Sequence, residues 1–193
     1  LAASHGSIWN ASQIGQSLGL SYHTVNGYLD YLEGAFLIRR LAPFHANTQK
    51  RLTKSPKVFW RDSGLLHALM GAASQDRLLV QPWVGASWEG FVIEQILSAL
   101  GAAGFSVEPF HFRTSDGWEI DLVLQAAGKR WAVEVKLSSS PGRADFDRLN
   151  RAADLIGAEC RMLVSRTESP AASATEVSTN LPGAIRFLRA ALS

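Results

Sequence analysis

The stretch from Trp118 to Lys136 constrains the fold of this chain most, because it has the pattern of two β-strands joined by a turn. Apolar residues alternate with Glu119 and Asp121 in its first half, and Trp131, Val133 and Val135 alternate with Glu134 and Lys136 in its second half. Successive side chains of a strand point to opposite faces, so Glu134 and Lys136 share a face, and hairpin pairing lets Asp121 approach them. Two carboxylates and an ammonium group at the end of a sheet can hold a divalent metal ion and a water.

The segment 86–100 predicts the strongest helix of the chain, which is apolar on several sides and ends at Gly101. Glu89 falls on its apolar stripe with Ile93, Ile96 and Leu100. A carboxylate in such a place is costly unless it is paired or binds a metal. The alternative is an edge position at the helix start, where the helix dipole favours a negative charge. Glu94 is expected to be solvated.

In the rest of the second half, the apolar pattern predicts a strand within 105–112 and the two central strands. It then predicts an amphipathic helix over 145–156 and a buried strand over 160–164. The Ser-, Thr-, Ala- and Pro-rich segment 167–183 is expected to be a mobile loop. A last helix is expected over 184–192.

The first forty residues predict a helix, a turn, a second helix and a strand. Asn10 or Ser12 caps the first helix and Gly19 ends it, whereas Ser21 caps the second and Gly34 ends it. A strand over 36–38 then runs into Arg39 and Arg40. This is the order of a winged helix-turn-helix, whose second helix can enter a DNA major groove with Tyr22, His23, Thr24 and Asn26 on its exposed side. Winged helices also serve as protein–protein connectors, and both alternatives stay open.

A basic stretch follows, with no Asp or Glu between Glu33 and Asp62. Such a cluster can neutralise phosphates, and Arg39, Arg40, Lys50, Arg51 and Lys54 are its candidate nucleic-acid contacts. The alternatives are a solvated basic loop or a surface for an acidic partner domain. A short strand over 58–60 and a helix over 64–70, capped by Asp62 or Ser63, are expected to close this part.

With 193 residues, 47% of them hydrophobic, the chain can form one large domain or two small ones. We expect a lobe over 1–71, a linker over 72–84 and a second lobe over 85–193. No apolar run reaches the length of a membrane span, so no membrane partner is expected. The single Cys160 favours a reducing, cytoplasmic setting. The start at Leu1 rather than Met suggests a fragment of a longer protein.

Glu89 in a helix, Asp121 in a strand and Glu134-x-Lys136 in the next strand resemble the PD-(D/E)xK nuclease superfamily, with Ile120 where that motif has Pro. The resemblance implies an α/β, restriction-endonuclease-like core behind the α+β winged helix-turn-helix lobe. The stretches TVNGYLDYLEGAFLIRRLAPF, KSPKVFWRDSGLLHALMG, WEGFVIEQIL, FRTSDGWEIDLVL and VEVKLS also resemble a domain of unknown function found C-terminal to bacterial and archaeal P-loop (AAA-type) ATPases. That resemblance implies an upstream ATPase domain in the same polypeptide.

The nuclease resemblance implies Mg²⁺ or Mn²⁺ as cofactor, with Glu89, Asp121, Glu134 and the backbone carbonyl of Val135 as ligands. Lys136 then acts with Asp121 and Glu134 in hydrolysis of a phosphodiester, with DNA as the expected nucleic acid, and Arg113 is a candidate phosphate contact. The competing hypothesis is an inactive nuclease fold that only binds DNA or couples the ATPase to a partner. A third, a transcription regulator, rests on the winged helix alone.

Overall fold

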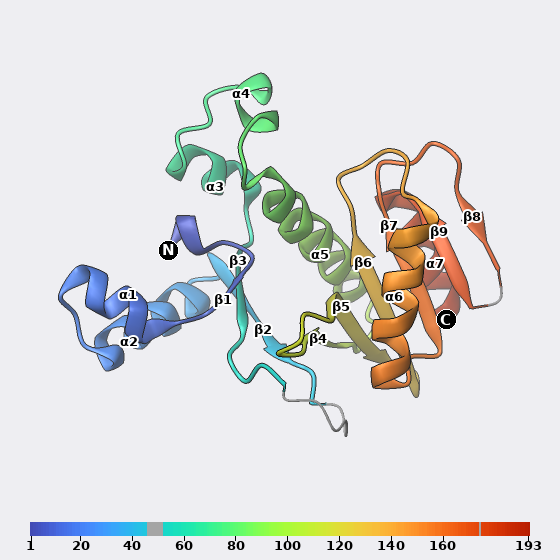
Figure 1. Ribbon diagram of the computed structural model, residues 1–193, viewed down its shortest axis with the longest axis horizontal. Coiled ribbons are helices and arrows are strands. Elements are labelled where there is room, and N and C mark those ends of the chain that lie inside the picture. The colour runs from blue at the N-terminus through green and yellow to red at the C-terminus, as the bar shows by residue number, and fades with distance from the viewer. Residues whose placement is uncertain (46–51, 174) are drawn as a thin grey trace. The chain divides into compact units, whose positions relative to one another are not determined.

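The computed structural model describes residues 1–45, 52–173 and 175–193 (Figure 1). The chain forms two compact units, one from Leu1–Leu41 and Ser55–Phe91, the other from Ala42–Lys54 and Val92–Ser193. The long helix α5, Val84–Ala102, contributes residues to both units, and so does the strand β2, Ile38–Pro43. The division into lobes expected from the sequence stays a prediction.

The first unit contains a small antiparallel sheet in the order β1–β3–β2, with β1 at Ser7–Ile8 and β3 at Lys57–Trp60. Its helices are η1 (Ala2–Ser4), α1 (Ala11–Leu18), α2 (Tyr22–Gly34), α3 (Ser63–Leu69) and α4 (Gln75–Leu79). The predicted caps of α1 and α2 are confirmed, because Asn10 accepts from the N–H of Gln13 and Ser21 accepts from that of Thr24. Gly19 ends α1 in the left-handed conformation.

The strand expected to run from 36–38 into Arg39 and Arg40 is present but begins two residues later, because α2 ends with a Schellman motif. Leu37 donates its N–H to the carbonyl of Leu32, and Phe36 takes the left-handed conformation at φ 59°. A glycine usually fills this left-handed position, whereas Gly34 is the last residue of α2, as predicted. The strand β2 therefore begins at Ile38.

The core of the first unit forms between α1, α2, α3 and the small sheet. Its buried members are Trp9, Ala11, Val25, Leu29, Ile38, Val58, Trp60 and Leu66. Asn26, expected on the exposed side of α2, instead accepts a hydrogen bond from the Trp9 indole at 2.9 Å. The imidazole of His5 accepts from the N–H of Trp60 through Nδ1, so Nε2 carries the proton that it donates to the Ala86 carbonyl.

The second unit is built on a mixed sheet in the order β4–β5–β6–β7–β9–β8, with residues 42–43 of β2 pairing parallel to β4. Pairing is antiparallel through β4, β5 and β6, parallel from β6 through β7 to β9, and antiparallel between β9 and β8. The strands are β4 (Glu108–Arg113), β5 (Glu119–Ala126), β6 (Lys129–Val135), β7 (Cys160–Val164), β8 (Ala171–Ala172) and β9 (Glu176–Thr179).

The predicted hairpin around Gly128 is confirmed. β5 and β6 pair from Ala126↔Lys129 to Leu122↔Val133, and both turn residues, Ala127 and Gly128, have positive φ. Such two-residue turns match the right-handed twist of the strands they join.

A β-bulge interrupts β5 at the point where the candidate site begins. Phe110 pairs with Val123 but Phe112 pairs with Ile120, so Asp121 and Leu122 together oppose the single residue His111. The strict alternation expected along β5 is therefore wrong. Ile120 and Val123 both pack in the same core cluster, three positions apart, because a bulge adds one residue and re-aims the side chains around it.

Two helices cover opposite faces of this sheet, as Figure 1 shows. α6, Arg143–Ile156, packs on β5, β6 and β7, and Ala132 of β6 belongs to its core cluster. The residue before it, Trp131, instead packs against α7, Leu181–Leu192. The centroids of the Trp131 and Phe187 rings lie 6.0 Å apart. Since neighbouring residues of a strand face opposite sides, α6 and α7 lie on opposite faces.

Two segments contain more structure than the sequence predicted. The expected linker 72–84 includes α4, which Ser74 caps, and the expected loop 167–183 includes β8 and β9. In β9, Val177 and Thr179 are buried and their neighbours less so, and the N–H of Ser165 donates to the Thr179 carbonyl at 2.9 Å. Pairing with β7 thus orders a segment whose composition favours a loop. Among the described residues, no helix combines the length and apolar character needed to cross a membrane.

Candidate functional site

Asp121 lies in the β5 bulge and is held by the neighbouring strand. Its Oδ2 atom accepts a 2.9 Å hydrogen bond from the buried backbone N–H of Val135. This contact lies just beyond the last backbone pair of the two strands, Leu122↔Val133, so a carboxylate takes the place of a carbonyl in the ladder. The position of the Asp121 carboxylate is therefore fixed by backbone rather than by a mobile side chain.

Glu134 lies on β6 beside Asp121 and is about 92% buried, with 8% of its surface exposed. Its Oε1 accepts from the Lys136 ammonium at 2.7 Å, but its Oε2 is buried without a hydrogen-bond partner. Burial, and after it the negative charge of Asp121, raise the pKa of Glu134 to about 7 against the opposing effect of Lys136. Two carboxylates thus share a site in which negative charge is under-compensated.

Lys136 follows β6 at the edge of this pair. Burial by itself lowers the pKa of its ammonium, but the negative charges of Glu134, Asp121 and Asp145 outweigh that effect, and the pKa is raised. Asp145 lies in the first turn of α6, where its carboxylate also accepts from the N–H of Gly142. Lys136 is therefore fully charged at neutral pH and stands between the sheet and the start of α6.

The residues present fit a small divalent cation. The partnerless Oε2 of Glu134 and the adjacent Asp121 carboxylate offer hard oxygen ligands, and the single Lys136 ammonium balances only part of their negative charge. In the described part of the chain, no three His, Cys, Asp or Glu side chains are grouped closely enough to hold a metal by themselves. Mg²⁺ is often bound by one or two carboxylates with waters completing the shell, so two suffice.

Glu89, the third acidic residue expected in the site, belongs to the first unit. Its Oε1 accepts a 2.9 Å hydrogen bond from Lys57, whose side chain is only 3% exposed. Lys57 is therefore buried, unlike the exposed basic residues expected around it, and it neutralises the partly buried Glu89. The carboxylate on the apolar stripe of α5 is paired, which is one of the two ways in which its burial becomes tolerable.

Glu94 was expected to be solvated, and that expectation is wrong. Its side chain is buried in the second unit, and Oε1 accepts a 3.0 Å hydrogen bond from Ser98 one turn later. α5 is buried around Glu94 by Val92, Ile93, Ile96 and Leu97. The pattern of this helix, apolar on several sides, was the available signal, because a helix that is apolar all round has no solvated face for Glu94.

Comparison with known protein families finds a match for most of the second unit. Residues 84–182, about half of the chain, are matched by the model of a family described as a domain of unknown function (DUF4143). The chain belongs to this family. Residues 1–76 are similar to a second family, described as a domain of unknown function (DUF8612). The hairpin that carries Asp121, Glu134 and Lys136 lies within the DUF4143 match.

This DUF4143 chain also resembles two curated mycobacterial proteins. One is the uncharacterized protein Rv2008c of Mycobacterium tuberculosis, and the other is the uncharacterized protein Mb2031c of Mycobacterium bovis. Each is 38% identical over 141 residues, which cover 73% of this chain. The chain spans only 31% of the length of these relatives.

The expected nucleic-acid contacts of the DUF8612-like part have different surroundings. Tyr22 and His23 are exposed at the start of α2, with their rings 5.5 Å apart. Arg40 pairs with Asp30 at 2.8 Å and also with Glu33. Arg39 is half-buried and already engaged by other groups. Tyr22 and His23 therefore present the more accessible surface of this set.

The other expected contacts belong to the second unit or fall outside the described residues. Lys54 is exposed, and the Arg113 guanidinium lies 3.6 Å from the Glu119 carboxylate. Lys50 and Arg51 lie outside the described residues. Glu119 in turn adds to the negative charge around Glu134, so Arg113 connects to the site through Glu119.

Proposed function

We propose that this chain is the metal-dependent phosphodiesterase module, of PD-(D/E)xK nuclease type, of a longer ATPase-containing protein. The observation that carries the proposal is the buried, partnerless Oε2 of Glu134 beside Asp121, with Lys136 at 2.7 Å from the same carboxylate. A site with unsatisfied negative charge and an adjacent ammonium suits hydrolysis of a phosphodiester better than it suits plain structural support.

Each residue has a role in this proposal. Asp121 and Glu134 hold Mg²⁺ or Mn²⁺, with the Val135 carbonyl as a further candidate ligand. The ion, when bound, lowers the pKa of a water and neutralises charge on the scissile phosphate. Lys136, held charged by its three acidic neighbours, orients the attacking water or stabilises the charge that develops on the phosphate. The Val135 N–H keeps the Asp121 carboxylate in place throughout.

The order of elements supports the nuclease-like fold. α5, β4, β5, β6, α6 and β7 follow one another as helix, three strands, helix and strand, with Asp121 on the second strand and Glu134 on the third. In the first unit, α1, α2, β2 and β3 follow the order of a winged helix-turn-helix, with Tyr22 and His23 exposed for contact with DNA. The ATPase is proposed from the resemblance in the sequence and from the greater length of the relatives.

A non-catalytic module is the second candidate, and one observation favours it. Lys136 already forms an ion pair with Glu134, so part of the charge that a metal would neutralise is balanced by the protein itself. A nuclease fold that has lost its chemistry can still bind DNA or couple the ATPase to a partner.

Calorimetry with Mg²⁺ and Mn²⁺ on the whole 193-residue chain tests the proposal. We expect binding that Asp121→Asn and Glu134→Gln abolish and that Glu168→Gln, an exposed control, leaves unchanged. The titration is repeated with a short oligonucleotide, because a substrate phosphate can complete the metal shell. No binding in either titration, with the circular dichroism of a folded chain, would leave the non-catalytic module as the function.

A further inference from the structure

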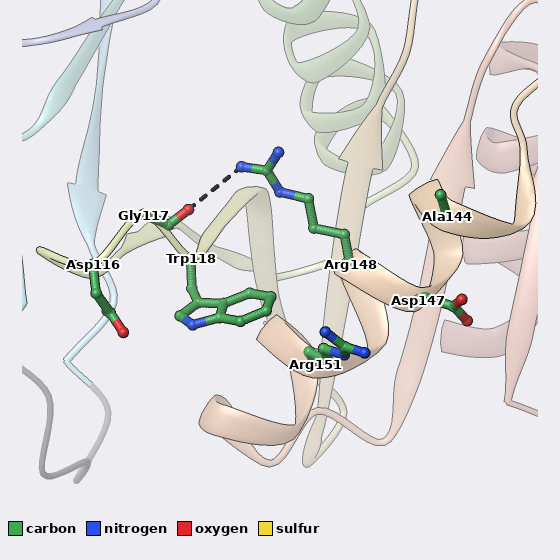
Figure 2. A pocket seen from close by; sticks show the side chains of 7 residues that line it. All are labelled: Asp116, Gly117, Trp118, Ala144, Asp147, Arg148 and Arg151. Carbon is green, nitrogen blue, oxygen red and sulfur yellow. Dashed lines mark hydrogen bonds between the residues drawn. The ribbon is translucent and has the colours of Figure 1, made fainter.

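A pocket of about 470 Å³ opens between the start of β5 and the middle of α6, within the second unit (Figure 2). A pocket of this size suits a small organic group rather than a single ion. The residues that line it are Asp116, Gly117, Trp118, Ala144, Asp147, Arg148 and Arg151.

An indole and two guanidinium groups dominate one part of the pocket. Trp118 is half-buried and packs by one side against the core under α6. Arg148 and Arg151 are exposed and three residues apart, so they project from the same side of the helix. Arg148 donates a 3.4 Å hydrogen bond to the carbonyl of Gly117, the residue before Trp118, and Figure 2 shows its side chain extended to that carbonyl.

The charges of the pocket are mixed. Asp116 and Asp147 also line it, and in Figure 2 the Asp147 carboxylate points away from the indole. A ligand that fits must bring an anionic group to the arginines and a flat ring to Trp118, and its hydrogen-bond donors can meet a carboxylate. A nucleotide has all three features, because it carries a phosphate, a planar base and ring or exocyclic N–H groups. A simple anion has only the first.

Both walls of the pocket adjoin the candidate metal site in sequence. Trp118 precedes Glu119, whose charge acts on Glu134, and Ala144 precedes Asp145, whose charge acts on Lys136. Trp118 and Asp121 are three residues apart, which is roughly 10 Å along an extended strand. A nucleic-acid strand with its scissile phosphate at Asp121 would reach the pocket within a few nucleotides.

We propose that this pocket captures an unpaired nucleotide of a single-stranded nucleic acid, with its base on Trp118 and its phosphate between Arg148 and Arg151. The inference rests on the proposed function, because it makes the pocket a subsite for the strand to be cut. Bases inside a duplex are stacked on one another and cannot lie on Trp118. The pocket therefore selects single-stranded or frayed substrates.

Fluorescence anisotropy in EDTA tests the pocket without catalysis. The probes are a fluorescein-labelled deoxythymidine 12-mer, its uridine counterpart and a 12-base-pair duplex. Trp118→Ala should weaken single-strand binding by about tenfold and Trp118→Phe by less, since stacking of one base has roughly that effect. Arg151→Gln should also weaken it and lower the slope of log K against log salt by about 0.7. Arg186→Gln, an exposed arginine on α7, is the charge-matched control and should change neither.

The inference fails if Trp118→Ala and Arg151→Gln bind the single strands as tightly as the unchanged chain does. It also fails if the duplex binds more tightly than the single strands. Because Trp118 packs on the core, circular dichroism checks its variants, and the exposed Arg151 gives an independent answer. Metal calorimetry on the same variants separates the two proposals: loss of metal binding concerns Asp121 and Glu134, whereas loss of strand binding in EDTA concerns the pocket alone.

Discussion

The backbone N–H of Val135 donates a 2.9 Å hydrogen bond to Oδ2 of Asp121, across the point where the β5–β6 ladder ends. A carboxylate that replaces a carbonyl in the ladder is oriented by the sheet itself. The bulge at Asp121 and Leu122 makes this contact possible, because it turns the Asp121 side chain toward β6. The same contact makes Asp121 both a structural and a candidate functional residue.

Two substitutions of Asp121 separate these roles. Asp121→Asn keeps an oxygen acceptor for Val135, whereas Asp121→Ala leaves that buried N–H without a partner. We expect the alanine variant to lose about 1–3 kcal/mol more of the free energy of unfolding than the asparagine variant. Both should lose metal binding. Urea unfolding gives the first comparison and calorimetry the second, and equal stability of the two variants would contradict the proposed role of the Val135 contact.

The pKa of Glu134 predicts a pH dependence of stability. Because this pKa is raised from 4.5 to about 7 in the folded protein, the folded state binds the proton more tightly than the unfolded state. The stability contributed by this group is fully present below about pH 4.5 and is lost as the pH rises through 7. We therefore expect Glu134→Gln to stabilise the fold at pH 8, on the order of 2 kcal/mol, and far less at pH 5.

Urea unfolding at the two pH values measures this effect, with Glu168→Gln as an exposed control. The same difference at pH 5 and pH 8 would show that Glu134 titrates normally. Mg²⁺ should also bind more tightly as the pH rises through 7, because Glu134 must lose its proton to act as a ligand.

Lys136→Gln removes the positive charge that opposes the raised pKa of Glu134. We expect that pKa to rise further and the pH needed for Mg²⁺ binding to rise with it. Hydrolysis of a labelled oligonucleotide should fall by about a hundredfold or more, since Lys136 is proposed to act on the reacting phosphate. Lys129→Gln, at an exposed lysine of the same hairpin, is the control. Unchanged hydrolysis and an unchanged pH profile would remove Lys136 from the site.

The ion pair between Lys57 and Glu89 predicts a large effect in the first unit. Glu89→Gln leaves the buried Lys57 ammonium without its carboxylate, which should cost about 3 kcal/mol of the free energy of unfolding. A Lys57→Met, Glu89→Leu double variant should be more stable than either single variant, because no charge is then buried alone. The prediction is contradicted if Glu89→Gln loses less of the free energy of unfolding than breaking an exposed ion pair costs.

Calorimetry on Glu89→Gln tests a separate question, whether Glu89 is also a metal ligand. The Mg²⁺ affinity falls only if it is.

Local signals in the sequence determined much of the secondary structure. The caps at Asn10, Ser21 and Asp62 all accept the hydrogen bonds that their positions predict. Cys160–Val164 is a strand with the expected bounds, and the turn at Gly128 joins the expected hairpin. These features follow from the few residues involved, because capping and turn geometry depend on local backbone conformation.

Long-range contacts decided the rest. Phe36 occupies a left-handed position that favours glycine, and β9 is ordered by β7 although its composition favours a loop. The alternation of residues placed Asp121, Glu134 and Lys136 near one another, but it could not predict the bulge. A bulge depends on the register between β4 and β5, which the alternation of residues along β5 alone does not reveal.

The sequence by itself thus determined which residues are the candidates for the site: Asp121, Glu134 and Lys136, at the open end of one hairpin. Tertiary structure alone decided the burial, the partners and the pKa values of the acidic residues. Burial leaves Oε2 of Glu134 without a partner and raises its pKa, and the Lys57 ion pair gives Glu89 a structural role. The tertiary structure also decided that Trp118, Arg148 and Arg151 line one pocket. The physical reason is that residue types set which charges exist, whereas desolvation and neighbouring charges set their energies, and these arise only when distant segments pack together.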